Sequence, residues 1–135
     1  MTDQRTITIP GKPIAKARPR FYRRGKFVGT FNCQETEEGR MKWEIAHQFN
    51  REPIPTGLPI ILQAVFYMPI PGSMSKKRLA EINYSHVKRP DCDNLLKMIK
   101  DCGNGVLWVD DSQVCEVHAK KIYDHNPRTE VTLEW

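Results

Sequence analysis

The alternation of apolar and polar positions along the chain predicts four β-strands. They are expected at residues 6–9, 60–68, 113–123 and 131–135. The second segment is apolar at nearly every position, which predicts a central strand covered on both faces of its sheet. The last two segments are separated by a turn at residues 124–127, so we expect them to pair as an antiparallel hairpin.

Apolar residues spaced by four positions predict a first helix over residues 34–49. Met41, Ile45 and Phe49 would share one face of this helix. Three glutamates near its start would favour the positive end of the helix dipole, and Asn32 is a candidate N-cap.

A second helix is predicted to begin just after Pro90. Leu95, Ile99 and Cys102 share its apolar face, and charged residues fall on the opposite side. The sequence Gly-Asn-Gly at residues 103–105 is a strong signal for its end.

Two connecting segments are polar and basic. Residues 11–27, GKPIAKARPRFYRRGKF, are rich in prolines and cations and are expected to form an exposed, extended arm. A second connection, residues 73–89, is expected to contain a short helix around residues 76–82. We therefore expect an α/β (α+β) fold in a single domain over residues 1–135, with one mixed sheet of about four strands and helices packed on it.

The composition is typical of a globular protein. The chain has 135 residues, 39% of them hydrophobic and 27% charged, which is enough to bury one core. No apolar run reaches the roughly 18 residues of a membrane span, and no signal-peptide core is present, so we expect a cytoplasmic protein without membrane contact. The four cysteines form no C-x-x-C pair, so reduced thiols are expected rather than a zinc site.

The net charge is +5, and the positive charge is concentrated in two segments. Between Arg5 and Lys26 there are eight lysines or arginines and no acid. A mildly basic chain can simply be more soluble, whereas concentrated cations suggest a polyanionic partner, with nucleic acid the first candidate. The side chains expected to hold DNA phosphates are Lys16, Arg18, Arg20, Arg23, Arg24, Lys76, Lys77, Lys88 and Arg89.

Two carboxylates lie two positions apart in the stretch RPDCDN, residues 89–94. Pro90 biases the chain before it toward an extended conformation, so Asp91 would lie at the helix entry and Asp93 in the first turn. Their carboxylates can converge there. The alternative is an ordinary N-cap and an ordinary first-turn acid, each contributing about 1 kcal/mol or less.

Asp110 and Asp111 form a second acid pair just before a predicted strand. Alone, such a pair is ordinary turn chemistry. Together, the two pairs would form an oxygen-rich site suited to Mg²⁺, which would offset acids facing DNA and activate a water. Lys97, one turn after Asp93, would either form an ion pair with it or reach a phosphate oxygen.

Residues 86–114, HVKRPDCDNLLKMIKDCGNGVLWVDDSQV, resemble the core of the RusA-type Holliday junction resolvases. The family pattern is a basic segment, Asp-x-Asp-Asn-x-x-Lys, a helix, and Asp-Asp-x-Gln-Val. The stretch GKPIAKARPRF near the N-terminus is also typical of phage- and prophage-borne members. The resemblance spans nearly the whole chain, and the combination of both acid motifs is more specific than either alone.

The resemblance implies a Mg²⁺-dependent endodeoxyribonuclease, in which Mn²⁺ would substitute. It implies that a homodimer binds four-way or other branched DNA and nicks two strands symmetrically, leaving 5′-phosphate and 3′-hydroxyl ends. It implies a catalytic role for Lys97, and we expect Asn94 to orient one of the acids by a hydrogen bond. The metal ligands that it implies are Asp91, Asp93, Asp111 and the neighbouring Asp110.

Two other functions fit the same residues. One is a non-catalytic module that binds branched DNA, which Mg²⁺-independent function would reveal. The other is a nuclease for other branched phage DNA, which relative cutting rates on junctions, flaps and linear duplex would reveal. The preferred cleavage sequence does not follow from the motif.

Overall fold

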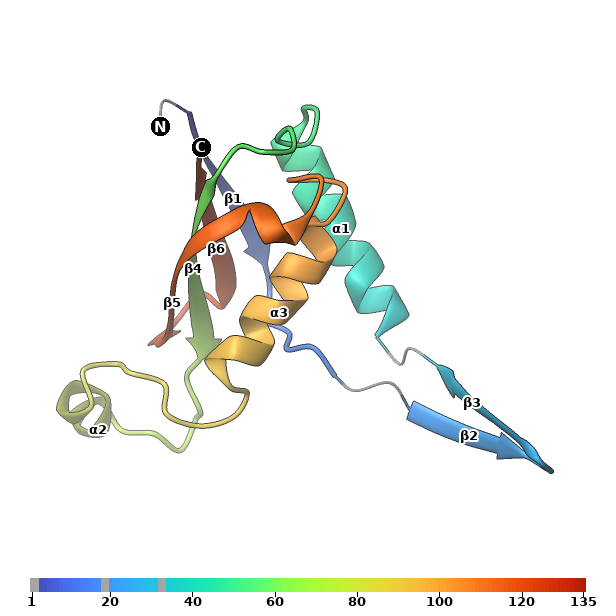
Figure 1. The fold of residues 1–135 in the computed structure, drawn as a ribbon. Helices are drawn as coiled ribbons and strands as arrows, with labels where there is room; N and C mark the ends of the chain where they lie inside the picture. The colour runs from blue at the N-terminus through green and yellow to red at the C-terminus, as the bar shows by residue number, and fades with distance from the viewer. Residues whose placement is uncertain (1–2, 18–19, 32–33) are drawn as a thin grey trace.

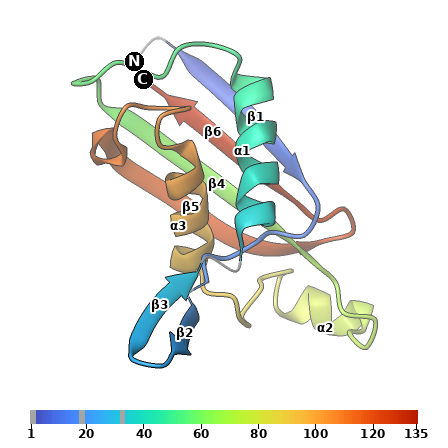
Figure 2. The same cartoon turned by 90° about the vertical axis from the view of Figure 1, so that its right-hand side faces the viewer.

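The structure, a computed structural model, describes residues 3–17, 20–31 and 34–135. It contains a four-stranded mixed sheet with helices packed on one face, and a separate two-stranded sheet (Figures 1 and 2). The strands of the main sheet are β1 (Gln4–Pro10), β4 (Ile60–Pro69), β5 (Val114–Asp124) and β6 (Arg128–Glu134). The helices are α1 (Glu35–Phe49), α2 (Lys76–Glu81), α3 (Cys92–Gly103) and the 3-10 helix η1 (Asp111–Gln113). The predicted α/β (α+β) fold is confirmed.

The strand order in the main sheet is β1-β6-β4-β5. β6 pairs antiparallel with both β1 and β4, whereas β4 pairs parallel with β5. The predicted hairpin of the last two strands is therefore wrong, because β4 lies between them. Parallel pairing is possible here because the long connection through α2 and α3 carries the chain back to the same end of the sheet.

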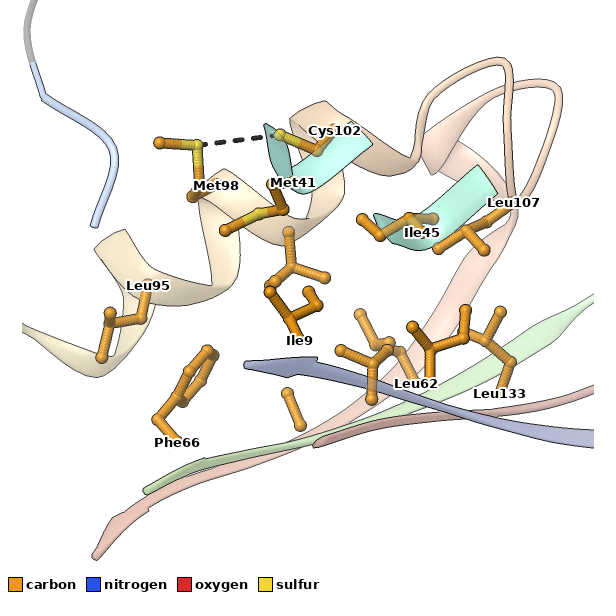
Figure 3. Packing of buried hydrophobic residues seen from close by; sticks show 14 of the residues in the cluster. Ile9, Met41, Ile45, Leu62, Phe66, Leu95, Met98, Cys102, Leu107 and Leu133 are labelled. Atoms are coloured by element: carbon orange, nitrogen blue, oxygen red, sulfur yellow. Dashed lines mark hydrogen bonds between the residues drawn. The ribbon is translucent and has the colours of Figure 1, made fainter. Parts of the chain in front are cut away.

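The core lies between the main sheet and the helices α1 and α3 (Figure 3). Each fully buried aliphatic or aromatic side chain in it contributes about 1.5–3 kcal/mol relative to an exposed one. The side chains labelled in Figure 3 that come from the sheet are Ile9, Leu62, Phe66 and Leu133, each at most 4% exposed. Those from the two helices are Met41, Ile45, Leu95, Met98 and Cys102.

The opposite face of β4 carries no helix, so the prediction that both faces of this strand are covered is wrong. Burial alternates along the strand, and Gln63 on the helix-free face is exposed. Apolar residues on this face are half-buried by their neighbours within the sheet. Tyr67, for example, lies under the guanidinium of Arg128, which is 3.7 Å from the ring centroid.

The predicted helices are confirmed, with small differences at their ends. Gln34 is the N-cap of α1 and makes no side-chain capping bond, and the predicted cap Asn32 lies outside the described residues. α3 ends at Gly103, and Gly105 adopts a φ of 77°, as expected for the Gly-Asn-Gly stop. No helix in the described part of the chain is long and apolar enough to cross a membrane.

The predicted basic arm contains an antiparallel hairpin that the sequence analysis missed. It consists of β2 (Arg20–Arg24) and β3 (Phe27–Phe31). Gly25 begins the two-residue turn with a φ of 58°, a conformation that glycine adopts at no steric cost. The apolar and polar alternation of a half-buried strand is absent, because this hairpin does not lie on the core.

Candidate active site

The first acid pair lies at the N-terminal end of α3. Asp91 is the N-cap residue, with an extended backbone (φ −70°, ψ 148°), and Asp93 lies in the first turn. Both side chains are exposed, and the Asp91 carboxylate makes no capping hydrogen bond. The interpretation of Asp91 as an ordinary side-chain cap is therefore not supported. Both acids instead lie at the positive end of the helix dipole.

The packing of α3 determines which of its residues face solvent. Leu95, Met98 and Ile99 are at most 1% exposed because they pack against the sheet and α1. Asp93 and Lys97 are exposed and lie one turn apart. The ion pairs among the described residues do not include one between them. The geometry therefore leaves the Lys97 ammonium in solvent rather than bound to Asp93.

Asn94 connects α3 to the basic arm through its main chain. Its carbonyl oxygen accepts a 3.0 Å hydrogen bond from the amide of Lys16. The expected side-chain bond from Asn94 to one of the acids is not among the described hydrogen bonds. The Lys16 ammonium lies 2.7 Å from Glu38 and 3.4 Å from Asp101. The bond to Glu38 raises the pKa of Lys16, and the two ion pairs hold the arm against α1 and α3. The DNA contact expected of Lys16 stays a prediction.

Lys121 holds the segment that leads into the first acid pair. Its Nζ donates to the carbonyl oxygens of Lys88 and Pro90, at 2.7 Å in both cases. The Arg89–Pro90 peptide bond within this segment is cis. This role of Lys121 was not predicted, although the sequence carries one signal for it: Lys121 is the charged residue on an otherwise apolar strand face. The other members of that face are Cys115, Val117, Ala119 and Tyr123.

Residues 84–86, just before this segment, are also hydrogen-bonded to β5. The amide of Tyr123 donates to the carbonyl of Tyr84 at 2.7 Å, and the amide of His86 donates to the carbonyl of Lys121 at 3.3 Å. The rings of His86 and Tyr123 pack with their centroids 4.9 Å apart. Burial, and next the charge of Lys121, lower the pKa of His86. The backbone that carries the first acids is thus held along an edge strand.

The second acid pair lies in the loop between α3 and β5. Asp110 precedes η1, and Asp111 is its first residue. The hydroxyl of Ser112 donates to Asp110 Oδ2 at 2.7 Å. This hydrogen bond is the largest cause of a lowered pKa for the Asp110 carboxyl. Asp110 is exposed and Asp111 is half-buried, so both remain accessible from solvent.

Gln113 determines the position of this loop. It is only 9% exposed, and its Oε1 accepts hydrogen bonds from the amides of Val109 and Asp110, both at 3.1 Å. Its Nε2 donates to the carbonyl of Pro55 at 2.7 Å and to two further carbonyls of the same segment. From the sequence, Gln113 was noted only as part of the Asp-Asp-x-Gln-Val pattern, with no structural role. Its positioning role depends on a segment more than fifty residues earlier in the chain.

Trp108 anchors the same loop from the core. Its side chain is 0% exposed, and its Nε1 donates to Asn104 Oδ1 at 2.8 Å. A Cβ atom on Gly103 would lie 2.9 Å from a carbon of the Trp108 ring. The end of α3 must therefore be glycine for the ring, and hence the loop, to pack as it does.

The two acid pairs do not come together within one chain. Figures 1 and 2 show η1, the short orange helix before β5, beside the C-terminal part of α3, whereas Asp91 and Asp93 belong to its N-terminal end. In residues 3–17, 20–31 and 34–135, no group of three or more His, Cys, Asp or Glu could hold a metal ion. The four-carboxylate set expected from the sequence is therefore not seen as one cluster among these residues and stays a prediction.

The donor chemistry of the first pair still fits Mg²⁺. Proteins commonly hold this ion through one or two carboxylates, with waters and substrate phosphate as the remaining ligands. Asp91 and Asp93 provide two exposed carboxylates at one helix end. The first pair therefore has the ligand type that a Mg²⁺ site completed by a phosphate would use.

Basic segments lie around this end of α3. Figures 1 and 2 place the β2–β3 hairpin and α2 at the end of the molecule where α3 begins, on different sides of it. The segment that leads into α3 is basic as well. The exposed cations of these three segments include Arg23, Arg24, Lys76, Lys77, Lys88 and Arg89. Two other predicted DNA contacts, Arg18 and the side chain of Arg20, lie outside the described residues.

Comparisons with known proteins match almost the entire chain. The family model described as "Endodeoxyribonuclease RusA" matches residues 10–134, a range that includes both acid pairs and the basic segments. The chain is also 34% identical to the "Uncharacterized protein YqaN" of Bacillus subtilis (strain 168) over 133 residues. That match covers 94% of this chain and 93% of the relative.

Proposed function

Because the chain belongs to the RusA endodeoxyribonuclease family, we propose that it is a Mg²⁺-dependent enzyme that cuts four-way DNA junctions by symmetric paired nicking. The observation that supports this best is the position of Asp91 and Asp93. Both acids are exposed at one end of α3, and basic segments lie around that end. Bare carboxylates repel DNA, so acids among phosphate-binding cations are best explained by a bound metal ion.

Asp91 and Asp93 would hold Mg²⁺ together with waters and a phosphate oxygen of the substrate. When bound, the ion would supply a Lewis acid for the phosphate and a more acidic water. The start of α3 would favour the same phosphate through its main-chain amides and dipole. The geometry of the first pair thus serves substrate binding and chemistry at one place.

Lys97 would stabilise negative charge on the phosphate during the reaction. It is exposed one turn after Asp93 and makes no ion pair with that acid among the described residues. The expected products are a 5′-phosphate and a 3′-hydroxyl, which a ligase can rejoin. Asp111 and Asp110 are proposed as further ligands on the family pattern, and their contribution has to be measured separately from that of the first pair.

A homodimer would suit this substrate. A four-way junction has approximate two-fold symmetry, and a closed two-fold dimer would present one acid end to each of two opposed strands. Paired nicking then follows from symmetry rather than from a second kind of site. We expect the active species to be this dimer, acting on DNA in the cytoplasm.

The test is cleavage of end-labelled four-way junctions with Mg²⁺ and with a chelator. We expect paired nicks that need the metal, and a loss of at least about 100-fold in Asp93→Asn, since even outer-shell partners of a metal cost 10- to 100-fold. Asp3→Asn is the matched control, because Asp3 is an exposed acid directly before β1, away from both acid pairs in the sequence. Paired nicking that persists in Asp93→Asn would overturn the proposal.

Metal binding provides an independent readout. Titration calorimetry with Mn²⁺ should show weaker binding in Asp93→Asn than in the wild type. The same titration of Asp111→Asn decides whether the second acid pair serves the same ion. Unchanged Mn²⁺ affinity in Asp93→Asn would remove the first pair from the metal site.

One observation favours a second function, the non-catalytic binding of branched DNA. The four acids of the family pattern do not meet in a single chain, so the chain alone has only two of them at the basic end. A binding module would bind junctions equally well with Mg²⁺ or a chelator and would leave every strand intact. The cleavage assay above separates the two functions.

A further inference from the structure

The β2–β3 hairpin projects from the body of the protein. Its two strands pair only with each other among the described strands, and Figures 1 and 2 show it extending away from the main sheet and the helices. Its base is held by Gln34, whose amide group accepts from the nitrogen of Ala17 at 2.8 Å and donates to the oxygen of Ala15 at 2.6 Å. The described residues on either side of the hairpin are thus held together by these two hydrogen bonds.

Large apolar side chains of this hairpin are exposed to solvent. Phe21 is 77% exposed, Phe27 is 61% exposed and Val28 is 56% exposed. Burial of a phenylalanine is favourable, and an isolated two-stranded hairpin is at best marginally stable in water. Such a grouping of apolar side chains on a projecting element is typical of a surface that a partner covers.

The two phenylalanines lie on opposite faces of the hairpin. Phe21 is opposite Thr30, whereas Phe27 is opposite Arg24, so the alternation along the strands directs their side chains to different faces. The ring of Tyr22 lies over Gly29, where a Cβ atom would be only 2.5 Å from it, and contacts Phe27 at a centroid distance of 6.1 Å. The hairpin therefore presents aromatic side chains on both of its faces, Phe21 on one and Tyr22 and Phe27 on the other.

The charge around these rings indicates the chemistry of the partner. Arg23, Arg24 and Lys26 are exposed on the same hairpin, and residues 4–34 contain no aspartate or glutamate. Cations beside stacking rings match a nucleic acid strand, because phosphates bind the cations and base faces bind the rings. A second copy of this chain would instead bring the same positive charges against each other.

The base of the hairpin lies close to the first acid pair. The amide of Lys16, just before the hairpin, donates to the carbonyl of Asn94 in the first turn of α3 at 3.0 Å. A DNA nucleobase held by the hairpin would therefore lie at the end of the protein that carries Asp91 and Asp93. Recognition by the hairpin and cutting at the acids would act on the same region of the DNA.

We propose that the β2–β3 hairpin is a wedge that enters the branch point of the DNA, where Phe21 and Phe27 stack on bases that lack a stacking neighbour. In intact duplex each base face is covered by the next base pair, whereas a branch point leaves faces open to a ring. The hairpin thereby supplies selectivity for branched over linear DNA, with its cations on the flanking phosphates. This role rests on the proposed function for its substrate but not on the chemistry of cutting.

The test uses junctions that carry 2-aminopurine either at the branch point or well inside one arm, in buffer with a chelator so that no strand is cut. The fluorescence of this base is quenched when the base stacks and rises when it unstacks, so it reports any change in stacking. We expect the wild type to change the fluorescence at the branch point only, and Phe21→Ala/Phe27→Ala to abolish that change. We also expect the double variant to bind junctions about tenfold more weakly, the loss of roughly one stacked base, and linear duplex within about twofold of the wild type.

Trp43→Ala is the matched control, because Trp43 is an aromatic residue on α1 with the same 61% exposure as Phe27. It should behave as the wild type. The double variant should also unfold at the same temperature as the wild type, since the hairpin does not belong to the core. A Trp43→Ala loss equal to that of the hairpin variant would show a general surface effect and overturn the proposal.

Three outcomes separate this inference from the proposed function. An unchanged junction affinity in the double variant overturns the wedge, whatever the enzyme cuts. A changed oligomeric state of the double variant in sedimentation shows that the hairpin joins copies of the chain, and it overturns the wedge as well. A wild type that cuts no branched DNA but still changes the branch-point fluorescence overturns the proposed function and supports the wedge.

Discussion

The ammonium group of Lys121 lies 2.7 Å from the carbonyl oxygen of Pro90, the residue that precedes Asp91. A second bond of the same length joins it to the carbonyl of Lys88. A lysine in the middle of an edge strand thus positions the chain at the point where α3 and the first acid pair begin. The charge of this lysine thus stabilises a main-chain conformation.

The variant Lys121→Met tests this relationship. We expect cleavage to fall about 10- to 100-fold, as for other residues that orient a metal ligand. The free energy of unfolding should fall by only about 1–3 kcal/mol, the usual contribution of hydrogen bonds to a charged group. Junction cleavage and urea unfolding measure the two effects. Lys120→Met is the control, because Lys120 is exposed and points to the opposite face of β5; equal cutting by both variants would contradict the positioning role.

The buried amide of Gln113 gives a second prediction. Gln113→Leu leaves the amides of Val109 and Asp110 and the carbonyl of Pro55 without their partner. We expect the free energy of unfolding to fall by about 1–3 kcal/mol, since these part-buried groups lose hydrogen bonds to a buried amide. Urea unfolding measures this loss. Ser112→Ala, which removes only the hydroxyl bound to Asp110, should cost far less.

Two glycines in helices predict effects of opposite sign. Gly103→Ala would place a Cβ atom 2.9 Å from the Trp108 ring, so we expect a loss of about 1–3 kcal/mol from overpacking. Gly39→Ala on α1 meets no atom within 4 Å and should stabilise the protein by about 0.5–1 kcal/mol. Thermal unfolding of the two variants measures both. Stabilisation by Gly103→Ala would show that the Trp108 ring is not held against the helix end.

His86 predicts a dependence of stability on pH. Burial lowers the pKa of His86 from its ordinary value of 6.5. As the pH falls below 6.5, the unfolded chain therefore binds a proton at this residue before the folded protein does, and the folded state loses stability. Well above that pH the histidine is neutral in both states, and the folded state keeps the whole of this contribution to its stability.

The variant His86→Phe checks this sign, because it keeps a ring against Tyr123 and removes the titration. Urea unfolding between about pH 7.5 and pH 5.5 should show a smaller loss of stability in the variant than in the wild type. Equal losses would mean that His86 takes up its proton equally well in the folded protein.

The cations of α2 predict the salt dependence of binding. If Lys76 and Lys77 contact phosphates, Lys76→Gln/Lys77→Gln should reduce the slope of log affinity against log salt by up to about 2, or roughly 0.9 per contact. Junction binding over a range of salt concentrations, with a chelator present, measures this slope. Lys120→Gln, an exposed lysine on the helix-free face of the sheet, should leave it unchanged. An unaltered slope in the α2 variant would remove this helix from the DNA-binding surface.

Short-range features of the structure were predictable from the sequence. The helix after Pro90 begins and ends where its apolar spacing and its glycines indicated, and Asp91 and Asp93 lie at its entry as expected. Both depend on residues within a few positions of each other. The basic hairpin was not predicted, because the prolines and cations before and within it favoured an extended arm, and its apolar residues Phe21, Phe27 and Val28 do not lie in the core.

Long-range relationships were not predictable in the same way. The sequence indicated four strands but not that β4 separates β5 from β6. The roles of Lys121 and Gln113 depend on carbonyl groups far away along the chain. Such main-chain partners leave no mark in residue type, because every residue carries the same carbonyl group.

By itself, the sequence determined the element types, the basic segments, the two acid pairs and the family, since these depend on local spacing and residue identity. Only the tertiary structure decided that the hairpin, α2 and the first acid pair lie at one end of the protein, and that the second acid pair lies beside the other end of α3. The physical reason is that strand order and helix packing are set by which apolar faces bury each other. That choice is made by the whole chain at once.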